Sequence, residues 1–176
     1  QVSMKNVEAL GLLKMDFLGL RNLDVIDKAV ELIGNGLDIG KIPMDDTRVF
    51  EMLARADSMG VFQFESSGMR EALRSVKPTQ FEDLIALVAL YRPGPMAYIP
   101  TYAARKNGRE QVTFIDERLK AITGETQGIC IFQEQYLVIA KTMAGFSGAE
   151  AETLRRAIGK KIHELMASLK EKFLDG

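Results

Sequence analysis

The stretch Thr79-Gln80-Phe81-Glu82-Asp83-Leu84-Ile85-Ala86-Leu87-Val88-Ala89-Leu90-Tyr91 ends in eight consecutive apolar residues. Thr79 and Glu82 have the spacing of a capping box, in which a hydroxyl and a carboxylate bond the first free N–H groups of a helix. A helix that is apolar on nearly all sides is normally buried. We therefore expect this segment to form the central helix of a mainly α-helical core.

Helix-start and helix-stop residues flank this central segment on its N-terminal side. Capping residues predict three further helices, and Gly34 and Pro78 are placed to end the first and the last of them. These helices are expected to begin at Asn22, at Asp45 or Asp46, and at Ser66 or Ser67.

On the C-terminal side, Arg92-Pro93-Gly94-Pro95 cannot lie inside a helix and predicts a rigid loop that presents Arg92. Apolar periodicity and glycine stops then predict helices in the ranges 99–107, 117–122, 133–144 and 147–159, followed by a last amphipathic helix. A few short strands are expected as well, over residues 10–20, 61–64 and 129–132.

The first expected strand carries an alternating pattern. Leu13, Met15 and Phe17 would face one side, while Lys14 and Asp16 would share the other, about 7 Å apart. A carboxylate in that position can hold a divalent cation. The alternative is a surface pair between Asp16 and Lys14, which the residues by themselves favour.

Composition narrows the classes of protein. The chain has 176 residues and a net charge of −1, so any surface that binds nucleic acid must be local. The single Cys130 excludes an internal disulfide, and the single His163 excludes a histidine-rich metal site. We find no segment of membrane-spanning length and no signal peptide, so a cytoplasmic protein is expected. The sequence opens at Gln1 without a methionine and reads as part of something larger.

The predicted helix over residues 147–159, with the two lysines that follow it, is basic. Ser147 and Glu150 form a second capping box, and an apolar stripe leaves Arg155, Arg156 and Lys160 on the other faces. These cations could clamp a triphosphate, since arginine binds oxygen pairs and lysine supplies a point charge. The alternative is a solvated basic helix end that Gly159 caps.

Other catalytic signatures are missing from the sequence. One histidine cannot supply a dependable Ser-His-Asp set, and neither a Walker loop nor a dinucleotide fingerprint is present. The residues by themselves therefore indicate a helical domain with one helix suited to anions and one acid on a strand.

Five phrases in fixed order give a closer assignment, because together they resemble the C-family replicative polymerases, the alpha subunits of bacterial DNA polymerase III. The phrases are Lys14-Met15-Asp16-Phe17-Leu18-Gly19-Leu20, Val61-Phe62-Gln63-Phe64-Glu65-Ser66, Leu90-Tyr91-Arg92-Pro93-Gly94-Pro95, Phe132-Gln133-Glu134-Gln135 and Leu154-Arg155-Arg156-Ala157-Ile158-Gly159-Lys160-Lys161.

The resemblance implies a division into domains and a set of site residues. Residues 1–20 would be the end of a palm domain, and residues 21–176 the N-terminal part of a helical fingers domain. Asp16 would be the third of three catalytic aspartates that bind Mg²⁺, with the other two upstream of this sequence. Lys14 would lie beside the incoming nucleotide. Arg155 and Arg156 would hold its triphosphate with help from Lys160 and Lys161, and Arg92 is a candidate phosphate or DNA contact.

The implied activity is template-directed deoxynucleotidyl transfer by a two-metal mechanism, with primer-template DNA and deoxynucleoside triphosphates as substrates. Other replicase subunits would bind through regions absent from this sequence, and the chain by itself is expected to be inactive. The alternative is a non-enzymatic helical module that binds nucleic-acid backbone through Arg155, Arg156 and Lys160.

Overall fold

The computed structural model describes residues 2–13 and 15–176. The chain divides into two units, one of which ends at Ile42 while the other runs from Pro43 to Gly176. Within the described ranges, the regular secondary structure consists of α-helices and short 3₁₀ helices without any strand. The prediction of a mainly α-helical fold is therefore confirmed.

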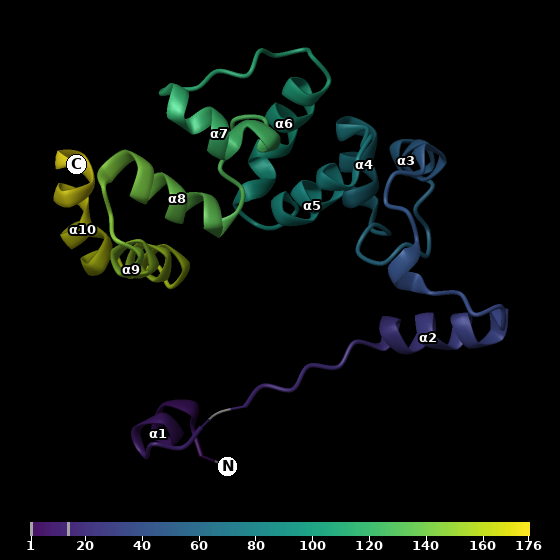
Figure 1. Ribbon diagram of the computed structural model, residues 1–176, viewed down its shortest axis with the longest axis horizontal. Helices are drawn as coiled ribbons and strands as arrows, with labels where there is room; N and C mark the ends of the chain where they lie inside the picture. Colours follow the sequence, from purple (N-terminus) through teal and green to yellow (C-terminus); the bar gives the residue numbers. More distant parts are fainter. Residues whose placement is uncertain (1, 14) are drawn as a thin grey trace. The chain divides into compact units, whose positions relative to one another are not determined.

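The N-terminal unit contains α1 (Met4–Ala9), α2 (Arg21–Ile33) and the 3₁₀ helix η1 (Ile39–Lys41) (Figure 1). Helix α2 begins after Leu20 and ends at Gly34, whose φ of 68° is left-handed, as the glycine stop predicts. Between α1 and α2 the described residues of segment 12–20 have no regular structure.

The expected strand over residues 10–20 is therefore wrong. An extended segment becomes a strand only when its N–H and C=O groups pair with a neighbouring strand. No such partner exists in the described part of the chain. The apolar side chains of the segment are consequently open to solvent, with Leu13 84%, Phe17 89% and Leu18 98% exposed.

The C-terminal unit begins with a group of helices that includes the apolar helix α5 (Phe81–Leu90). The others are α3 (Thr47–Ala54), α4 (Ser67–Val76), η2 (Pro95–Tyr98) and α6 (Ile99–Lys106). Leu87 and Leu90 of α5 are buried together with Leu73 of α4 and Tyr102 of α6. The helix belongs to the core as predicted, but it is not buried on nearly all sides, because Phe81 is 40% and Ile85 45% exposed. The helix that packs against α3, α5 and α6 is α4.

The start of α5 differs by one residue from the expected capping box. Gln80 is the N-cap, and Asp83 instead of Glu82 returns the hydrogen bonds, accepting from the N–H groups of Thr79 at 2.9 Å and Gln80 at 3.2 Å. Because one carboxylate serves two backbone donors, the helix start is fixed more tightly than a single cap would fix it.

Asp83 is also the centre of a buried polar cluster. It is 1% exposed, accepts a hydrogen bond from the Tyr102 hydroxyl at 3.1 Å, and pairs with the Lys106 ammonium at 3.3 Å. Burial, together with the charge of Asp83, raises the pKa of Tyr102 well above its ordinary value. These contacts join the start of α5 to α6.

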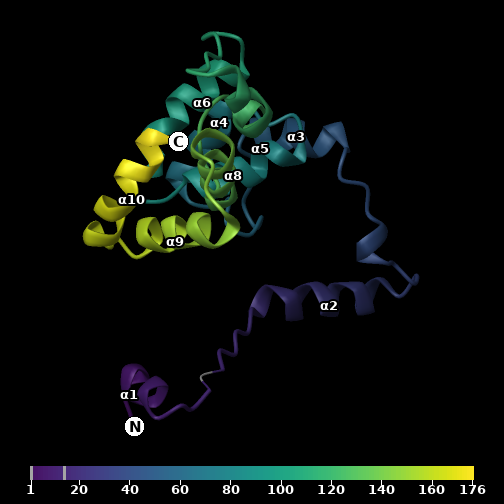
Figure 2. The same ribbon diagram turned by 60° about the vertical axis from the view of Figure 1, so that its left-hand side comes forward.

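The remaining helices of the C-terminal unit are η3 (Glu117–Leu119), α7 (Lys120–Thr123), η4 (Gly124–Thr126), α8 (Gln133–Ala144), α9 (Gly148–Gly159) and α10 (His163–Asp175). In two views the last three lie against one another (Figures 1 and 2). A second apolar cluster joins them, formed by Ala140, Ala144, Phe146 and Ala151 with Leu169 packed against it.

The two other expected strands are wrong as well. Residues 61–64 form a turn in which Gln63 has a left-handed φ of 66°. Over residues 129–132, the N–H groups of Ile131 and Phe132 donate to the side-chain oxygen of Gln135, at 2.7 and 2.9 Å. A side chain thus takes up the backbone donors that a strand would have used.

Candidate functional site

Helix α9 is anchored firmly at its N-terminal end. The Ser147 hydroxyl accepts from the Glu150 N–H, and the Glu150 carboxylate accepts from the Ser147 N–H at 2.9 Å, which confirms the predicted capping box. Glu150 also pairs with Lys172 of α10. The hydrogen bond from Lys172 and those from Ser147 lower the pKa of Glu150 to about 2.

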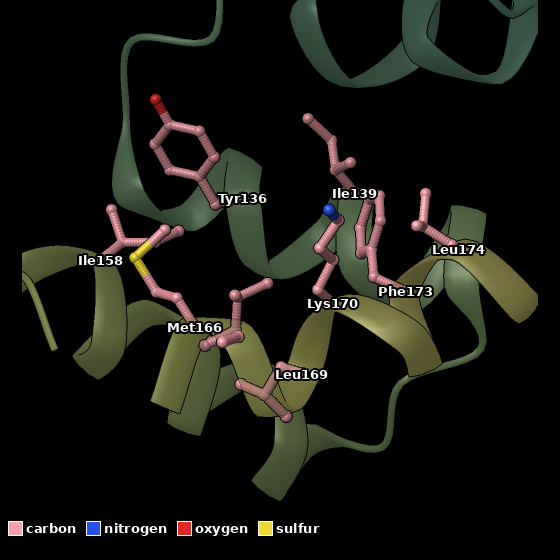
Figure 3. A pocket seen from close by; sticks show the side chains of 10 residues that line it. Tyr136, Ile139, Ile158, Met166, Leu169, Lys170, Phe173 and Leu174 are labelled. Carbon is pink, nitrogen blue, oxygen red and sulfur yellow. The ribbon is translucent and has the colours of Figure 1, made fainter. Parts of the chain in front are cut away.

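The apolar side of α9 packs as its periodicity predicts. Ala151 and Ala157 are fully buried, and Leu154 packs against the cluster between α8 and α9. Beside this contact, the three helices leave an apolar hollow of about 410 Å³. Figure 3 shows its walls, with Tyr136 and Ile139 from α8, Ile158 from α9, and Met166 and Phe173 from α10.

Arg155 is held in one orientation on the polar side of α9. Its Nε donates to Glu152 at 2.9 Å, and its Nη1 donates to the side-chain oxygen of Gln133, the first residue of α8, at 3.0 Å. The hydrogen bonds from Arg155 lower the pKa of Glu152 below its ordinary value. The Arg155 side chain remains 38% exposed.

Arg156 is exposed and, among the residues that the structure describes, its side chain has no hydrogen bond or ion pair. Gly159 is the last helical residue, Lys160 is the C-cap, and Lys161 has a left-handed φ of 53°. The helix therefore continues through the glycine that was expected as its cap. Both lysines are exposed and follow Arg156 at four and five positions along the chain.

The basic end of α9, formed by Arg155, Arg156, Lys160 and Lys161, thus combines one oriented guanidinium with three solvent-facing cations. No side chain lies within 4 Å of where a Cβ on Gly159 would sit, so the backbone there is open to approach. Guanidinium groups bind two oxygens of a phosphate at once, and ammonium groups add charge. This end of the helix can therefore bind a polyanion.

The two residues that orient Arg155 are not among the predicted site residues. Glu152 stands three positions before Arg155, a spacing at which helix side chains interact, so this pair could have been predicted. Gln133 is 22 positions away, and only the packing of α8 on α9 brings it close.

Asp16 belongs to the N-terminal unit, where it lies exposed in the irregular segment between α1 and α2. Lys14, its expected neighbour, lies outside the described residues. No group of three or more histidine, cysteine or acidic residues is arranged to hold a metal ion in the described ranges. The metal-binding role of Asp16 therefore remains a prediction.

Arg92 lies exposed in the predicted loop between α5 and η2. Its N–H donates to the Leu90 carbonyl at 2.8 Å and its carbonyl accepts from the Met96 N–H at 3.2 Å, so backbone bonds fix the loop. Gly94 has a φ of 104°, which only glycine adopts readily. The role of Arg92 as a phosphate or DNA contact stays a prediction.

Comparison with known proteins identifies the family. The family described as bacterial DNA polymerase III alpha subunit finger domain matches residues 22–176. The chain belongs to this family. The resemblance found in the sequence is thus confirmed, while the assignment of residues 1–20 to a palm domain stays a prediction.

Relatives named DNA polymerase III subunit alpha match this finger-domain chain over its whole length. The protein of Thermus aquaticus is 49% identical over 185 residues, and that of Halalkalibacterium halodurans is 46% identical over 180 residues. The protein of Staphylococcus aureus is 45% identical over 180 residues. The chain spans only 15%, 16% and 17% of these three relatives, respectively.

One further finding concerns membranes. No helix in the described part of the chain is both long enough and apolar enough to cross a lipid bilayer.

Proposed function

We propose that this chain is part of a replicative DNA polymerase that catalyses template-directed deoxynucleotidyl transfer. Within it, the basic end of α9 binds the triphosphate of the incoming nucleotide. The proposal rests on two neighbouring arginines, one of which is oriented by hydrogen bonds while the other is exposed to solvent. Arg155 is oriented by Glu152 and Gln133, and Arg156 is exposed beside it, on a helix of a polymerase finger domain.

The electrostatics of the helix support a role for these cations. The C-terminal end of a helix carries a partial negative charge, which by itself repels anions. Four cationic side chains within residues 155–161 outweigh that charge and the single acid, Glu152, that pairs there. A triphosphate is a multiply charged ligand that would gain from several such contacts at once.

Anchoring at the other end of α9 supports the same role. Its capping box and the pair between Glu150 and Lys172 tie the helix start to α10, while Ala151 and Ala157 are buried. A helix fixed in this way presents its arginines in a defined place, and binding is stronger when ligand-facing groups are already ordered.

Asp16 would supply one carboxylate toward Mg²⁺. Magnesium in phosphate-transfer sites is usually held by one or two carboxylates plus substrate phosphates, so Asp16 would act with acids from elsewhere in a full-length polymerase. The bound ion would stabilise negative charge on the reacting phosphate oxygens. In this proposal residues 1–20 end the palm and residues 21–176 form the N-terminal part of the fingers.

The remaining site residues have supporting roles. Lys14 would lie beside the incoming nucleotide, and Lys160 and Lys161 would add charge near its phosphates. Arg92, which a rigid loop presents to solvent, would contact phosphate or DNA. Primer-template DNA and deoxynucleoside triphosphates would be the substrates, and other replicase subunits would bind through parts of the polymerase outside this chain.

The test is Arg156→Ala in a full-length polymerase that contains this chain. Losing one charge-assisted contact costs about 1.5–3 kcal/mol, which lowers kcat/KM for the nucleotide roughly 10- to 150-fold. Affinity for primer-template should change little. Steady-state kinetics and a DNA-binding assay measure the two effects separately.

Arg48→Ala is the matched control, because Arg48 is an exposed arginine that already pairs with Asp46. It should leave both measurements near the wild-type values. If Arg156→Ala instead weakened DNA binding while KM for the nucleotide stayed constant, α9 would be a nucleic-acid backbone contact. That outcome would favour the non-enzymatic binding module.

A further inference from the structure

A second basic site lies in the C-terminal unit, where α4 and α6 both end. A hollow of about 360 Å³ is lined by Arg74, Ser75, Lys77, Asn107 and Arg109. Three of these five residues are cations, and none is an acid or an aromatic residue. The charged side chains of the hollow are therefore all positive, and no aromatic ring is present on which a base could stack.

The three cations are not needed to cap the helices at whose ends they lie. The Asn107 amide donates to the carbonyls of Ser75 at 3.1 Å, Val76 at 3.3 Å and Ala103 at 2.7 Å. The Lys77 N–H donates to the Leu73 carbonyl at 2.8 Å. These partners bond four of the carbonyls at the two helix ends, and none of the four bonds comes from a charged side chain of the hollow.

Neighbouring acids do not neutralise the hollow either. Glu110, which follows Arg109 in the chain, bonds the Nε of Arg105 at 2.8 Å instead. Across the part of the chain that the structure describes, the side chains of Arg74, Lys77 and Arg109 make no hydrogen bond or ion pair. Three unneutralised cations around one hollow are a natural receptor for phosphate oxygens.

The backbone at Lys77 sets where its side chain begins, because Lys77 is the C-cap of α4. Its φ of 52° is left-handed, a conformation in which helices usually end with glycine or asparagine. A lysine is disfavoured there, because its Cβ crowds the following carbonyl. This conformation fixes the start of a charged side chain at the rim of the hollow.

We propose that this hollow binds the phosphodiester backbone of DNA, at a site separate from the basic end of α9. Contacts of this type are independent of base sequence and come from arginine, lysine and small polar side chains, which is the composition of this lining. The choice of DNA among polyanions rests on the proposed polymerase function, whereas the anion site itself rests on the geometry of the hollow.

The test uses the 176-residue chain and a fluorescein-labelled 20-base-pair duplex, with binding followed by anisotropy from about 25 to 200 mM salt. Each phosphate contact contributes about 0.9 to the slope of log affinity against log salt. Removing all three cations should flatten the slope by about 2–3 and weaken binding roughly tenfold or more at low salt. The hollow variant is Arg74→Gln with Lys77→Gly and Arg109→Gln.

A charge-matched control removes three exposed cations of the same unit that already pair with Asp46, Asp57 and Glu117. It should change the slope by less than about 1, the value of one contact. Equal losses in both variants, or unchanged binding by the hollow variant, would overturn the proposal. The control variant is Arg48→Gln with Arg55→Gln and Lys120→Gln.

A single substitution tests whether misfolding, and not the loss of charge, explains weaker DNA binding by the triple variant. Lys77→Gly relieves the left-handed strain, so its thermal melt should lie at or above that of the wild type, while the salt slope still falls by about 1. A variant that melts normally and binds DNA like the wild type counts against the proposal. Binding of heparin but not of duplex DNA would reject DNA as the ligand.

The proposed triphosphate site on α9 and the proposed DNA site in the hollow can be refuted independently of each other. A chain in which Arg155, Arg156 and Lys160 are changed to glutamine tests whether α9 carries the DNA contact. If that variant lost all affinity for the duplex and the hollow variant lost none, the hollow would be excluded. The nucleotide kinetics of Arg156→Ala decide the role of α9 without reference to the hollow.

Discussion

Asp83→Asn is a sharp test of what holds the C-terminal unit together. The change keeps the shape of the side chain and removes its charge. Asp83 accepts hydrogen bonds from the Thr79 and Gln80 N–H groups and from the Tyr102 hydroxyl, and it pairs with Lys106. An asparagine has one acceptor oxygen for these donors, and its amide adds two donors of its own.

The size of the effect follows from burial. The side chains of Asp83 and Lys106 are 2% and 10% exposed, so the substitution leaves an ammonium group without its counter-charge in a nearly dry place. Breaking a buried pair by removing one partner costs about 3–5 kcal/mol. For a chain of this length, that loss lowers Tm by roughly 6–20 °C.

The loss of stability is measured by unfolding the chain with heat and with urea while its helix content is monitored by circular dichroism. Glu82→Gln, at the neighbouring exposed position, is the matched control and should stay within about 0.5 kcal/mol of the wild type. Adding Lys106→Met to Asp83→Asn should recover part of the loss, because it removes the uncompensated charge. A cost below about 1 kcal/mol for Asp83→Asn would refute the assignment of this cluster as a structural centre.

In a full-length polymerase, Asp16→Asn should lower single-turnover incorporation by about 100-fold or more, because the carboxylate proposed to bind Mg²⁺ loses its charge. Normal rapid-quench incorporation would remove Asp16 from the active site. The pKa of Glu150 lies at about 2 against an ordinary 4.5, so its stabilising contacts are complete above about pH 4.5 and are lost as the pH falls toward 2. Urea melts between pH 7 and 3 should show this loss in the wild type, and Glu150→Gln should flatten it; parallel profiles would contradict the assignment. The chain by itself should not extend a primer with Mg²⁺ and all four nucleotides, and extension that co-purifies with it would count against the proposed division of the site.

Most helices of this chain could be predicted because their signals are local. Ser66 caps α4, and Ser147 with Glu150 caps α9, as the spacing of the residue types indicates. Gly34 ends α2 through a left-handed φ. Each of these devices acts within one turn of the helix, so the sequence contains the whole interaction.

The absence of the three expected strands could not be predicted from sequence. A strand needs a pairing partner, and the alternation of apolar and polar residues does not show whether one exists. At residues 129–132 the deciding group is the Gln135 side chain, which takes the backbone donors. Likewise, the cations of α9 are visible in sequence, but the bond from Arg155 to Gln133 and the hollow between α4 and α6 depend on packing between distant segments.

The exposed apolar residues between α1 and α2 have a consequence for handling the free chain. Extended segments with uncovered Leu13, Phe17 and Leu18 can add edge to edge to copies of themselves and aggregate. Charges that interrupt such a run act as gatekeepers against this association. Lys14 and Asp16 stand within the run in the sequence, so the carboxylate that we propose for Mg²⁺ binding would also act against aggregation of the free chain.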